Sequence, residues 1–364
     1  MRVLVVNAGS SSVKLRLLAD DDSLAGSVDL PAEEGKVDEG ELAPRLGELG
    51  PADAIGHRVV HGGTRFTAPV VIDDDSLAAL DALTELAPLH QPTALELIRV
   101  LRRLQPETPA VACVDTAFHA TLPPAAYTYP LPAAWRSRFG VRRFGFHGLS
   151  HAWASRRAAA MLDGPEEAVR VVTCHLGSGA SLAAVAGGRS VDTTMSFTPL
   201  DGLVMATRSG AVDPGLVLWL ATCGRIPLDD LERELYHGSG LRGLAGTADM
   251  KTVVERAEVG EADAALALDV YLHRLRSMIA AMAAALSGMD ALVFTGGVGE
   301  RSPVVRQGAA DGLGFLGIAV DAALNADARP DVEITGPGAA VRTFVVNARE
   351  DLEIARLTRQ ALGG

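Results

Sequence analysis

A turn of small hydroxyl residues near the start of the chain has the composition of an anion-binding loop. It reads Asn7-Ala8-Gly9-Ser10-Ser11-Ser12, and the cation Lys14 follows closely. Backbone N–H groups and serine hydroxyls in such a turn can point at one anion, such as a phosphate. The turn lacks the G-x-x-x-x-G-K-[ST] pattern of a Walker loop, and no helix is expected after it. Taken alone, an ordinary hairpin with a polar turn explains this segment equally well.

Further along, charged side chains stand at the ends of tight apolar segments. Arg58, Asp115, His147 and Arg208 are the main examples. Arginine donates hydrogen bonds in pairs to carboxylates and phosphates. Arginines and histidines that converge with an Asp and a Glu would suit phosphoryl transfer, which needs charge neutralisation and Mg²⁺ held by carboxylates.

Several other polar residues have a second interpretation that the residues leave open. Arg142 and Arg143 can equally form a solvated surface pair, and His61, His90 and His119 can be structural histidines. A zinc site is disfavoured because neither H-E-x-x-H nor paired C-x-x-C is found. The three cysteines, at positions 113, 174 and 223, are widely spaced, which predicts reduced core residues and not a disulfide set or a metal site.

The composition indicates a globular protein that handles anions only locally. The chain has 364 residues, 48% hydrophobic and 21% charged, which suggests two domains with ample core. A net charge of −12 argues against nucleic acid as the main partner, since such a surface repels phosphates. No signal peptide precedes the first predicted strand, and no apolar stretch approaches the roughly 20 residues needed to span a bilayer. We therefore expect a cytoplasmic protein with no membrane contact.

Two strand–turn–strand patterns are expected to carry the chemistry. Val3–Val6 predicts a buried strand, and residues 13–17 alternate as a half-buried strand does. The pattern returns later, where the apolar run 169–174 feeds the turn His175–Gly179 and a returning strand over 180–186. Two α/β halves, each with a phosphate-binding turn, are the organisation that this echo predicts.

The remaining segments complete the predicted layout. Residues 20–50 are acidic and rich in turn formers, so we expect an exposed excursion. The strand 291–294 leads into Gly296-Gly297-Val298-Gly299-Glu300, a turn that lets a ligand lie against bare backbone. Ser302-Pro303 then predicts the N-cap and first residue of a helix. A proline-rich stretch at 123–132 fits a domain boundary near residue 120.

These segments together resemble the acetokinase family, within the superfamily of actin-like sugar kinases and heat-shock ATPases. The resemblance covers nearly the whole chain, in ordered motifs at Val5–Lys14, His57–Gly63, Ala87–Pro92, Asp115–His119, Arg142–His151, His175–Ser181, Thr198–Gly210 and Phe294–Glu300. It implies an α/β fold of two actin-like (ribonuclease H-like) domains with a duplicated βββαβαβα core and a central cleft. We expect domain one at residues 1–119 plus 352–364 and domain two at 120–351, with a homodimer formed through the second.

The resemblance also implies a reaction and a role for each matching residue. ATP and acetate would exchange a phosphoryl group with Mg²⁺ or Mn²⁺, giving ADP and acetyl phosphate. Asp115, His147, Arg208 and Arg58 would be catalytic, and Asn7 and Glu350 would hold the metal. Arg58 would also bind the acetate carboxylate, beside a methyl pocket of Val60, Leu89, Phe146 and Pro199. The nucleotide would contact Ser10, Ser12, Lys14, His175, Leu176, Gly177, Ser178, Gly179, Asp249, Met250, Lys251, Gly297, Val298, Gly299, Glu300 and Arg301.

This chain departs from the family pattern at four positions, Ser178, Ala211, Lys251 and Arg349, where the family usually has Asn, Asp, Arg and Asn. They bear on the nucleotide more than on the reaction. Two alternatives therefore stay open: a kinase for propionate or butyrate, since one methylene gives only about 1–3 kcal/mol of discrimination, and an ATP-binding regulator without turnover.

Overall fold

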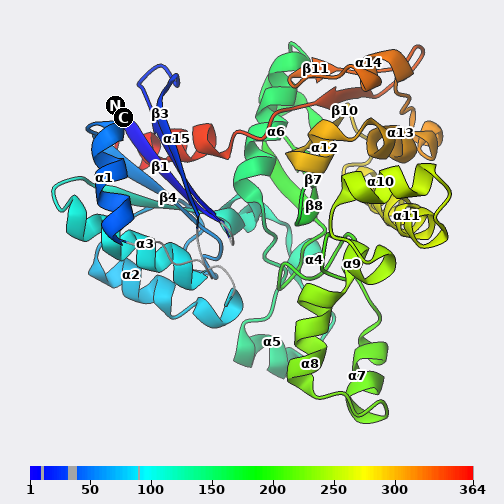
Figure 1. The fold of residues 1–364 in the computed structure, drawn as a ribbon, viewed down its shortest axis with the longest axis horizontal. Helices are drawn as coiled ribbons and strands as arrows, with labels where there is room; N and C mark the ends of the chain where they lie inside the picture. Colours follow the sequence, from blue (N-terminus) through cyan, green and yellow to red (C-terminus); the bar gives the residue numbers. More distant parts are fainter. Residues whose placement is uncertain (10–11, 32–38, 89–90, 364) are drawn as a thin grey trace. The chain divides into compact units, whose positions relative to one another are not determined.

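The computed structural model describes residues 1–9, 12–31, 39–88 and 91–363, which form two units, each built on its own six-stranded sheet (Figure 1). The first unit comprises Met1–Ala120, Phe146–Trp153 and Arg349–Gly364, and the second comprises Thr121–Gly145 and Ala154–Ala348. The predicted α/β class is confirmed. The domain ranges proposed from the sequence stay a prediction.

In the first unit, β1 lies inside a mixed sheet with the strand order β3-β2-β1-β4-β6-β5. β1 to β3 form an antiparallel meander, β4 and β6 run parallel to β1, and β5 is an antiparallel edge. The strands are β1 (Val3–Ala8), β2 (Ser12–Leu18), β3 (Leu24–Pro31), β4 (Ala54–Val59), β5 (Val70–Val71) and β6 (Ala110–Val114). The helices are α1 (Glu39–Leu49), α2 (Asp74–Asp81), η1 (Thr84–Leu86), α3 (Gln91–Leu104), η2 (Asp115–Thr121) and α15 (Glu350–Ala361).

Apolar side chains on both faces bury this sheet. Leu4 and Val6 of β1 belong to a core with α1, α2 and α3, whereas Val3 and Val5 belong to a second core with Ile354 of α15. Successive side chains of a strand point to opposite faces, so a strand covered on both sides is apolar throughout. This explains the continuous apolar run of β1 that the sequence analysis interpreted as a buried strand.

Residues 20–50 correct one expectation. They hold β3, which pairs with β2, and α1, whose Leu42, Leu46 and Leu49 are buried in the core. Most described residues of this segment are exposed, as predicted, but the segment is regular structure that packs on the core and not an excursion. Residues 32–38 lie outside the described residues. The apolar positions repeat at helical spacing among charged neighbours, and the acidic composition obscured that amphipathic pattern.

The second unit repeats the plan of the first, with the order β9-β8-β7-β10-β12-β11. An antiparallel meander of β7 to β9 is again followed by parallel strands β10 and β12 and an antiparallel edge, β11. The predicted strand–turn–strand echo is confirmed, and the two mixed sheets agree with duplicated actin-like domains. The strands are β7 (Arg170–Leu176), β8 (Ala180–Ala186), β9 (Arg189–Thr193), β10 (Ala291–Thr295), β11 (Val332–Glu333) and β12 (Arg342–Val345).

The helices of this unit pack around that sheet, with α11 against β7, β8 and β9. Ser302 caps α13 by accepting from the Val305 N–H, and Pro303 is its first residue, as predicted. The helices are α4 (Pro124–Tyr127), α5 (Ala133–Phe139), α6 (Gly148–Met161, which begins in the first unit), η3 (Glu166–Ala168), α7 (Pro214–Thr222), α8 (Leu228–Arg233), η4 (Glu234–Gly238), α9 (Gly240–Ala245), α10 (Met250–Glu258), α11 (Ala262–Ala285), α12 (Gly296–Arg301), α13 (Pro303–Asp311), η5 (Gly314–Leu316) and α14 (Ala322–Ala326).

The cysteines follow the prediction only in part. Cys113 in β6 and Cys174 in β7 are buried free thiols, but Cys223 is exposed, so the core assignment is wrong for that residue. Cys223 caps the end of α7, a helix without a buried residue, which explains the difference. Among the described helices, none is long and apolar enough to cross a membrane.

One buried histidine in the first sheet makes stability depend on pH. His57 of β4 is 1% exposed, and its Nε2 has no hydrogen-bond partner among the described residues. Burial lowers the pKa of His57 from its ordinary value of 6.5 to about 3. Between these two pKa values His57 is protonated in the unfolded chain and neutral in the folded chain. The free energy of unfolding therefore falls as the pH drops below about 6.5.

We predict that His57→Leu flattens this acid limb. In the wild type, the proton taken up by His57 on unfolding should make the free energy of unfolding fall by roughly 1.4 kcal/mol per pH unit between about pH 6 and pH 4. The variant should lack this contribution. Urea unfolding of the wild type and the variant at pH 7, 6, 5 and 4 measures it. Parallel curves for the two proteins would contradict the assignment.

Candidate active site

Three neighbouring parallel strands of the first unit end in polar residues. Asn7 is near the end of β1, Arg58 near the end of β4, and Asp115 directly follows β6. Because β1, β4 and β6 are adjacent and parallel, their carboxyl ends share one edge of the sheet. In open α/β sheets, ligands bind at this edge.

A buried ion pair organises this edge. Both Nε and Nη2 of Arg58 donate to Asp115 Oδ2, at 3.2 and 2.7 Å. The Asp115 side chain is 1% exposed, and its Oδ1 is buried without a hydrogen-bond partner in the described residues. A buried carboxylate is tolerated where a cation pairs with it, so Asp115 and Arg58 fix each other.

The two partners shift each other's pKa values. Burial raises the pKa of the Asp115 carboxyl, and the nearby guanidinium opposes that shift by favouring the charged form. Burial would lower the pKa of Arg58, but the carboxylates of Asp115 and Glu350 outweigh it and raise that pKa above its ordinary value. Arg58 therefore stays a permanent cation at this edge.

Asn7 and Glu350 join the same network. Asn7 Nδ2 donates to Glu350 Oε2 at 2.9 Å, and Arg58 Nη1 donates to Asn7 Oδ1 at 3.3 Å. Arg58 Nη1 also lies 3.8 Å from Glu350 Oε2. The two predicted metal ligands thus lie together, beside the ion pair.

The oxygen atoms gathered here fit a hard divalent cation. Mg²⁺ prefers oxygen ligands and is usually held by one or two carboxylates with substrate phosphates and water. Glu350, the unpartnered Asp115 Oδ1 and the Asn7 amide are of that kind. Within the described ranges, no cluster of three or more His, Cys, Asp or Glu could hold a metal alone. Phosphate and water oxygens would have to complete the shell.

His147 stands just before α6 in an unusual backbone conformation. Its φ is +56°, in the left-handed region that few residues other than glycine occupy. The next residue, Gly148, packs so closely on Asp115 that an added Cβ would lie 2.0 Å from the Asp115 carbonyl oxygen. The absence of a side chain at Gly148 therefore lets the backbone next to His147 approach the backbone of Asp115.

The predicted apolar contacts to substrate are distributed over both units. Val60 directly follows β4, and Phe146 is 1% exposed with its ring edge-on to His61, 5.6 Å between centroids. Pro199 belongs to the second unit, where its carbonyl accepts from Arg208 Nη1 at 3.1 Å. Leu89 lies outside the described residues.

The N-terminal turn that we predict to bind phosphate is described only in part, because Ser10 and Ser11 lie outside the described residues. Its ends are joined by the Gly9 N–H, which donates to the Ser12 carbonyl at 2.8 Å. Lys14 lies opposite Asn7 in the β1–β2 register and is exposed. Arg16 and, to a smaller extent, Lys14 lower the pKa of Asp29, which lies opposite Lys14 on β3, so contact of the Lys14 ammonium with a nucleotide stays a prediction.

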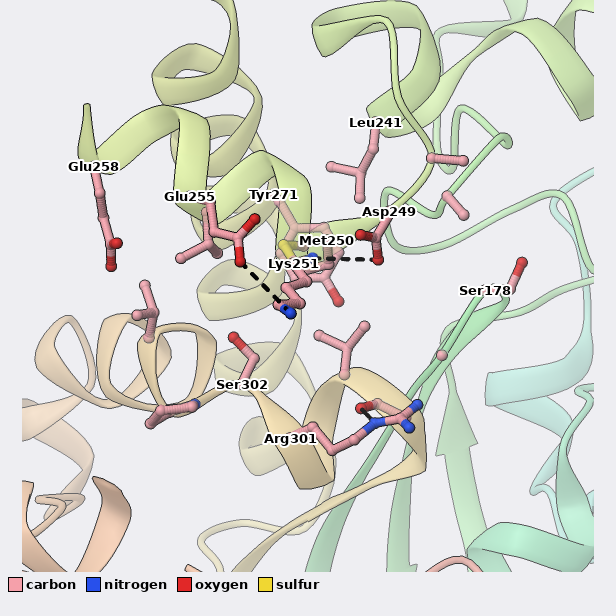
Figure 2. Close-up of a pocket in the computed structure, with 18 residues that line it drawn as sticks. Ser178, Leu241, Asp249, Met250, Lys251, Glu255, Glu258, Tyr271, Arg301 and Ser302 are labelled. Atoms are coloured by element: carbon pink, nitrogen blue, oxygen red, sulfur yellow. Dashed lines mark hydrogen bonds and ion pairs between the residues drawn. The ribbon is translucent and has the colours of Figure 1, made fainter. Parts of the chain in front are cut away.

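In the second unit, the equivalent strand ends surround a pocket of about 750 Å³ (Figure 2). The wall from β7 holds Gly177 and Ser178, while His175 and Leu176 end the strand and Gly179 closes the turn by accepting from the Gly177 N–H at 2.9 Å. The remaining lining is Ala206, Leu241, Ala248, Asp249, Met250, Lys251, Val254, Glu255, Glu258, Tyr271, Gly297, Val298, Arg301, Ser302, Pro303 and Val304. This largely apolar lining suits a flat ring system.

Three charged groups of one wall of the pocket, Asp249, Lys251 and Glu255, have partners within the protein. Asp249 caps α10 by accepting from the N–H groups of Lys251 and Thr252. Lys251 Nζ lies 3.7 Å from Glu255, one helical turn further along the same helix (Figure 2). Both side chains are more than half exposed, so this pair contributes little energy, but it does reduce the net charge at the pocket rim.

The opposite wall is the glycine turn that follows β10. Gly296 has φ +78°, and an added Cβ would lie 2.8 Å from the Leu176 carbonyl, so a side chain would be strained here. Glu300 Oε1 accepts from the N–H groups of Gly296 and Ala348, at 3.1 and 3.0 Å. Arg301 folds back onto this turn and donates from Nε to the Gly297 carbonyl (Figure 2).

Arg208 is a guanidinium with neutral partners. Besides the Pro199 carbonyl, its Nη1 contacts Met205 Sδ at 3.9 Å. Burial lowers its pKa, with a smaller opposing effect from Tyr236. No ion pair involves Arg208 in the described part of the chain. Its charge is thus left for an anionic ligand.

Comparison with known proteins places these features in a family. A sequence profile described as the Acetokinase family matches residues 44–356. The chain belongs to the acetokinase family. It is 49% identical over 327 residues to an acetate kinase from Synechococcus sp., covering 90% of this chain and 80% of the relative. It is 44% identical to an acetate kinase from Pseudarthrobacter chlorophenolicus, covering 100% and 99%.

Solved structures agree with the assignment to the acetokinase family. The crystal structure of Porphyromonas gingivalis acetate kinase matches with a TM-score of 0.91 at 33% identity, covering 99% of both chains. A propionate kinase from Francisella tularensis matches with the same TM-score, identity and coverage. The chain is accordingly a phosphotransferase, and the predicted fold class is confirmed.

The sequence analysis missed several residues that this acetokinase-family fold brings to the pocket. Glu255 and Tyr271 line it, as do Ser302, Pro303 and Val304. The spacing of Lys251 and Glu255, four residues apart on a predicted helix, is a signal that was available in the sequence. Tyr271 carries no such signal, because α11 comes to the pocket only through tertiary packing.

We predict that Gly148→Ala lowers turnover at least about 10-fold. The new Cβ must push the His147 segment away from Asp115, and such overpacking costs typically 1–3 kcal/mol. Steady-state kinetics and thermal unfolding measure both effects. Gly47→Ala is the matched control: it lies in α1 with no atom within 4 Å of the added Cβ, so its activity should be unchanged. Full activity of Gly148→Ala would show that this close approach is dispensable.

Proposed function

We propose that this enzyme is a Mg²⁺-dependent acetate kinase, which reversibly transfers a phosphoryl group from ATP to acetate to give acetyl phosphate and ADP. The observation that carries the proposal is the Arg58–Asp115 pair beside Asn7 and Glu350, at the carboxyl ends of β1, β4 and β6. It combines a fixed cation for a carboxylate with oxygen ligands for a metal. The names of the relatives support the same activity.

The reaction brings two anions together, so cations must screen both reactants. Arg58 would bind the acetate carboxylate, and Arg208 would neutralise carboxylate and phosphoryl oxygens. His147 would donate to the transferring phosphoryl group. Bound Mg²⁺, held by Asn7 and Glu350 with the free oxygen of Asp115, would supply further charge neutralisation on the phosphates.

Asp115 acts in this scheme by orienting Arg58 and not as a base. Acetate is already a carboxylate at pH 7 and needs no proton removed before it attacks. The geometry supports this role, because one carboxylate oxygen of Asp115 accepts two hydrogen bonds from Arg58. Transfer would then be direct and in line, from ATP to the acetate oxygen.

The pocket of the second unit would hold ATP or ADP. Its apolar lining suits the adenine ring, and the turns at Gly177–Gly179 and Gly297–Arg301 would lie against the phosphates. Two departures from the family pattern are electrostatically mild here. Lys251 is paired with Glu255, and Arg349 is paired with Asp351 at 2.9 Å, so neither adds an unbalanced cation. Ser178, where the family usually has Asn, keeps a polar group at the pocket edge, but its side chain is shorter and reaches less far.

A kinase for a longer acid is the second candidate. The match to a propionate kinase equals the match to an acetate kinase in TM-score and identity, which favours neither acid. The test of the proposed function must therefore compare carboxylic acids of different chain length as phosphoryl acceptors.

The test is a hydroxamate assay for acyl phosphate with ATP and Mg²⁺, run with acetate, propionate and butyrate. We expect turnover on all three acids to fall with chain length and acetate to have the highest kcat/KM. Asp115→Asn should lose turnover by at least about 100-fold, since Arg58 loses its ionic partner, while ADP binding by calorimetry stays close to wild type.

Other results would revise the proposal in defined ways. Higher kcat/KM on propionate or butyrate would assign the longer acid. No acyl phosphate from any acid, with ADP still bound, would favour a non-catalytic ATP-binding regulator. Unchanged turnover in Asp115→Asn would remove Asp115 from the mechanism.

The enzyme would act as a homodimer formed through the second unit. α7 is apolar along almost its whole length, yet none of its residues is buried; Leu218 and Trp219 are 66% and 56% exposed. At the start of α8, which packs against α7, Leu228 is 71% exposed. An apolar helix of this kind is normally covered. A second copy, presenting the same helix about a two-fold axis, would cover it.

We predict that Trp219→Glu produces a monomer, because the interface would have to bury an unpaired charge. Light scattering coupled to size exclusion should give twice the chain mass for the wild type and once that mass for the variant. Phe315→Glu is the matched control, since Phe315 is 77% exposed outside α7 and α8. A monomeric wild type would refute the homodimer.

A further inference from the structure

A buried arginine behind the nucleotide pocket has no role in the function described so far. Arg306 in α13 is 1% exposed and is among the largest fully buried side chains. Its guanidinium donates to Asn325 Oδ1 and to the carbonyl oxygens of Gly299, Glu300 and Asn325, at 2.7, 2.9, 2.8 and 2.7 Å. All of these acceptors are neutral.

This arrangement is unusual for a buried charge. Arginine is almost never fully buried unless it is paired, and the described residues place no carboxylate within ion-pair distance of Arg306. Burial lowers the pKa of Arg306 to about 10, so the side chain stays protonated at neutral pH. The protein thus keeps an uncompensated cation in its interior.

The hydrogen bonds of Arg306 hold one wall of the pocket. Gly299 and Glu300 lie in the last turn of α12, where helix carbonyls lack partners within the helix. Asn325 of α14 anchors the other side of the guanidinium and donates from Nδ2 to the Pro303 carbonyl at 2.9 Å. Arg306 therefore ties α12, α13 and α14 together, directly behind the lining residues that run from Gly297 to Val304.

We propose that Arg306 is a positioning residue for the nucleotide: its planar fork fixes the α12 wall, and its unpaired charge favours the polyanionic ligand that this wall contacts. The proposal rests on the proposed function, because it takes the ligand of this pocket to be ATP or ADP. Arg306 does not line the pocket, so it acts through α12 and through its electrostatic field.

The two parts of the proposal have separate physical causes. The guanidinium joins two sides of the pocket wall, because Nη1 donates to the Gly299 and Glu300 carbonyls while Nε and Nη2 donate to Asn325. An ammonium has a single nitrogen and cannot reach both sides at once. A neutral donor could satisfy the same oxygen atoms without the cost of burying a charge. The retained charge gains its compensation only when an anion binds, and the two stabilise each other to the same extent.

The test compares Arg306→Lys and Arg306→Gln with the wild type. Calorimetry with ADP should show affinity reduced about 10-fold for Lys, which keeps the charge but loses the fork, and about 100-fold for Gln, which loses both. Steady-state kinetics should show the same rise in KM for ATP, with KM for acetate and kcat within about 2-fold of wild type. The thermal stabilisation by ADP should shrink in parallel.

Arg276→Lys is the matched control. Arg276 also donates from Nε to a carbonyl of α13, that of Gly308, at 2.7 Å, but it does not line or brace the pocket wall. This variant should lose stability at most and bind ADP as the wild type does. If the Arg306 variants lose only stability and keep wild-type ADP affinity, the residue is a structural clamp and the proposal fails.

If the Arg306 variants do not fold, Asn325→Asp tests the charge of Arg306 separately from its hydrogen-bond geometry. It puts a carboxylate where Oδ1 now accepts from Arg306 at 2.7 Å, so the cation becomes compensated in place. ADP affinity should then drop about 10-fold although the fork is intact; wild-type affinity in a folded Asn325→Asp would overturn the role of the charge. Because these measurements use binding of ADP alone, a wild type that binds no ADP would signal instead that the proposed function is wrong.

Discussion

The first unit depends on one buried carboxylate that must keep a cation beside it. Asp115 directly follows β6 at 1% exposure, and Arg58 on the adjacent strand reaches it with two donors. The parallel register of β4 and β6 sets that distance, and Asn7 and Glu350 are then drawn to the remaining donor of the same guanidinium. Sheet pairing, the predicted metal ligands and the proposed substrate-binding cation are thus parts of one electrostatic arrangement.

The duplicated fold gives the same sheet edge two different arrangements of charge. In the first unit the strands end in charged groups that neutralise one another. In the second, β7 and β10 are followed by glycine-containing turns without a charged pair, and Arg208 and Arg306 contact only neutral atoms. A self-neutralised edge suits a metal and a small carboxylate, whereas unpaired cations behind bare backbone suit phosphates.

Local patterns in the sequence predicted much of the fold, and the features that they missed were missed for physical reasons. Small residues after the apolar strands β1 and β7 predicted both strand–turn–strand units, because few other sequences can follow a strand so tightly. That these turns bind phosphate stays a prediction. The amphipathic α1 was missed where acidic residues dominate the composition, and Cys223 was misplaced because an unburied apolar helix violates the usual pattern. Arg306 could not be found from the sequence, since its partner Asn325 lies 19 residues away on a separate helix.

The net charge of the chain makes these unpaired arginines necessary. A protein with 45 acidic and 33 basic side chains repels anionic reactants unless cations are set apart from the surrounding carboxylates. Lys251 and Arg349 contribute little to neutralising anionic reactants, because each is paired with a neighbouring acid. Arg306 is buried among carbonyl and amide oxygens, and the partly buried Arg208 donates to the Pro199 carbonyl and contacts Met205 Sδ. Electrostatic interactions are stronger in the low dielectric of such surroundings than in water. Burial that would be a defect in a purely structural arginine thus becomes the means by which an acidic protein holds two anions.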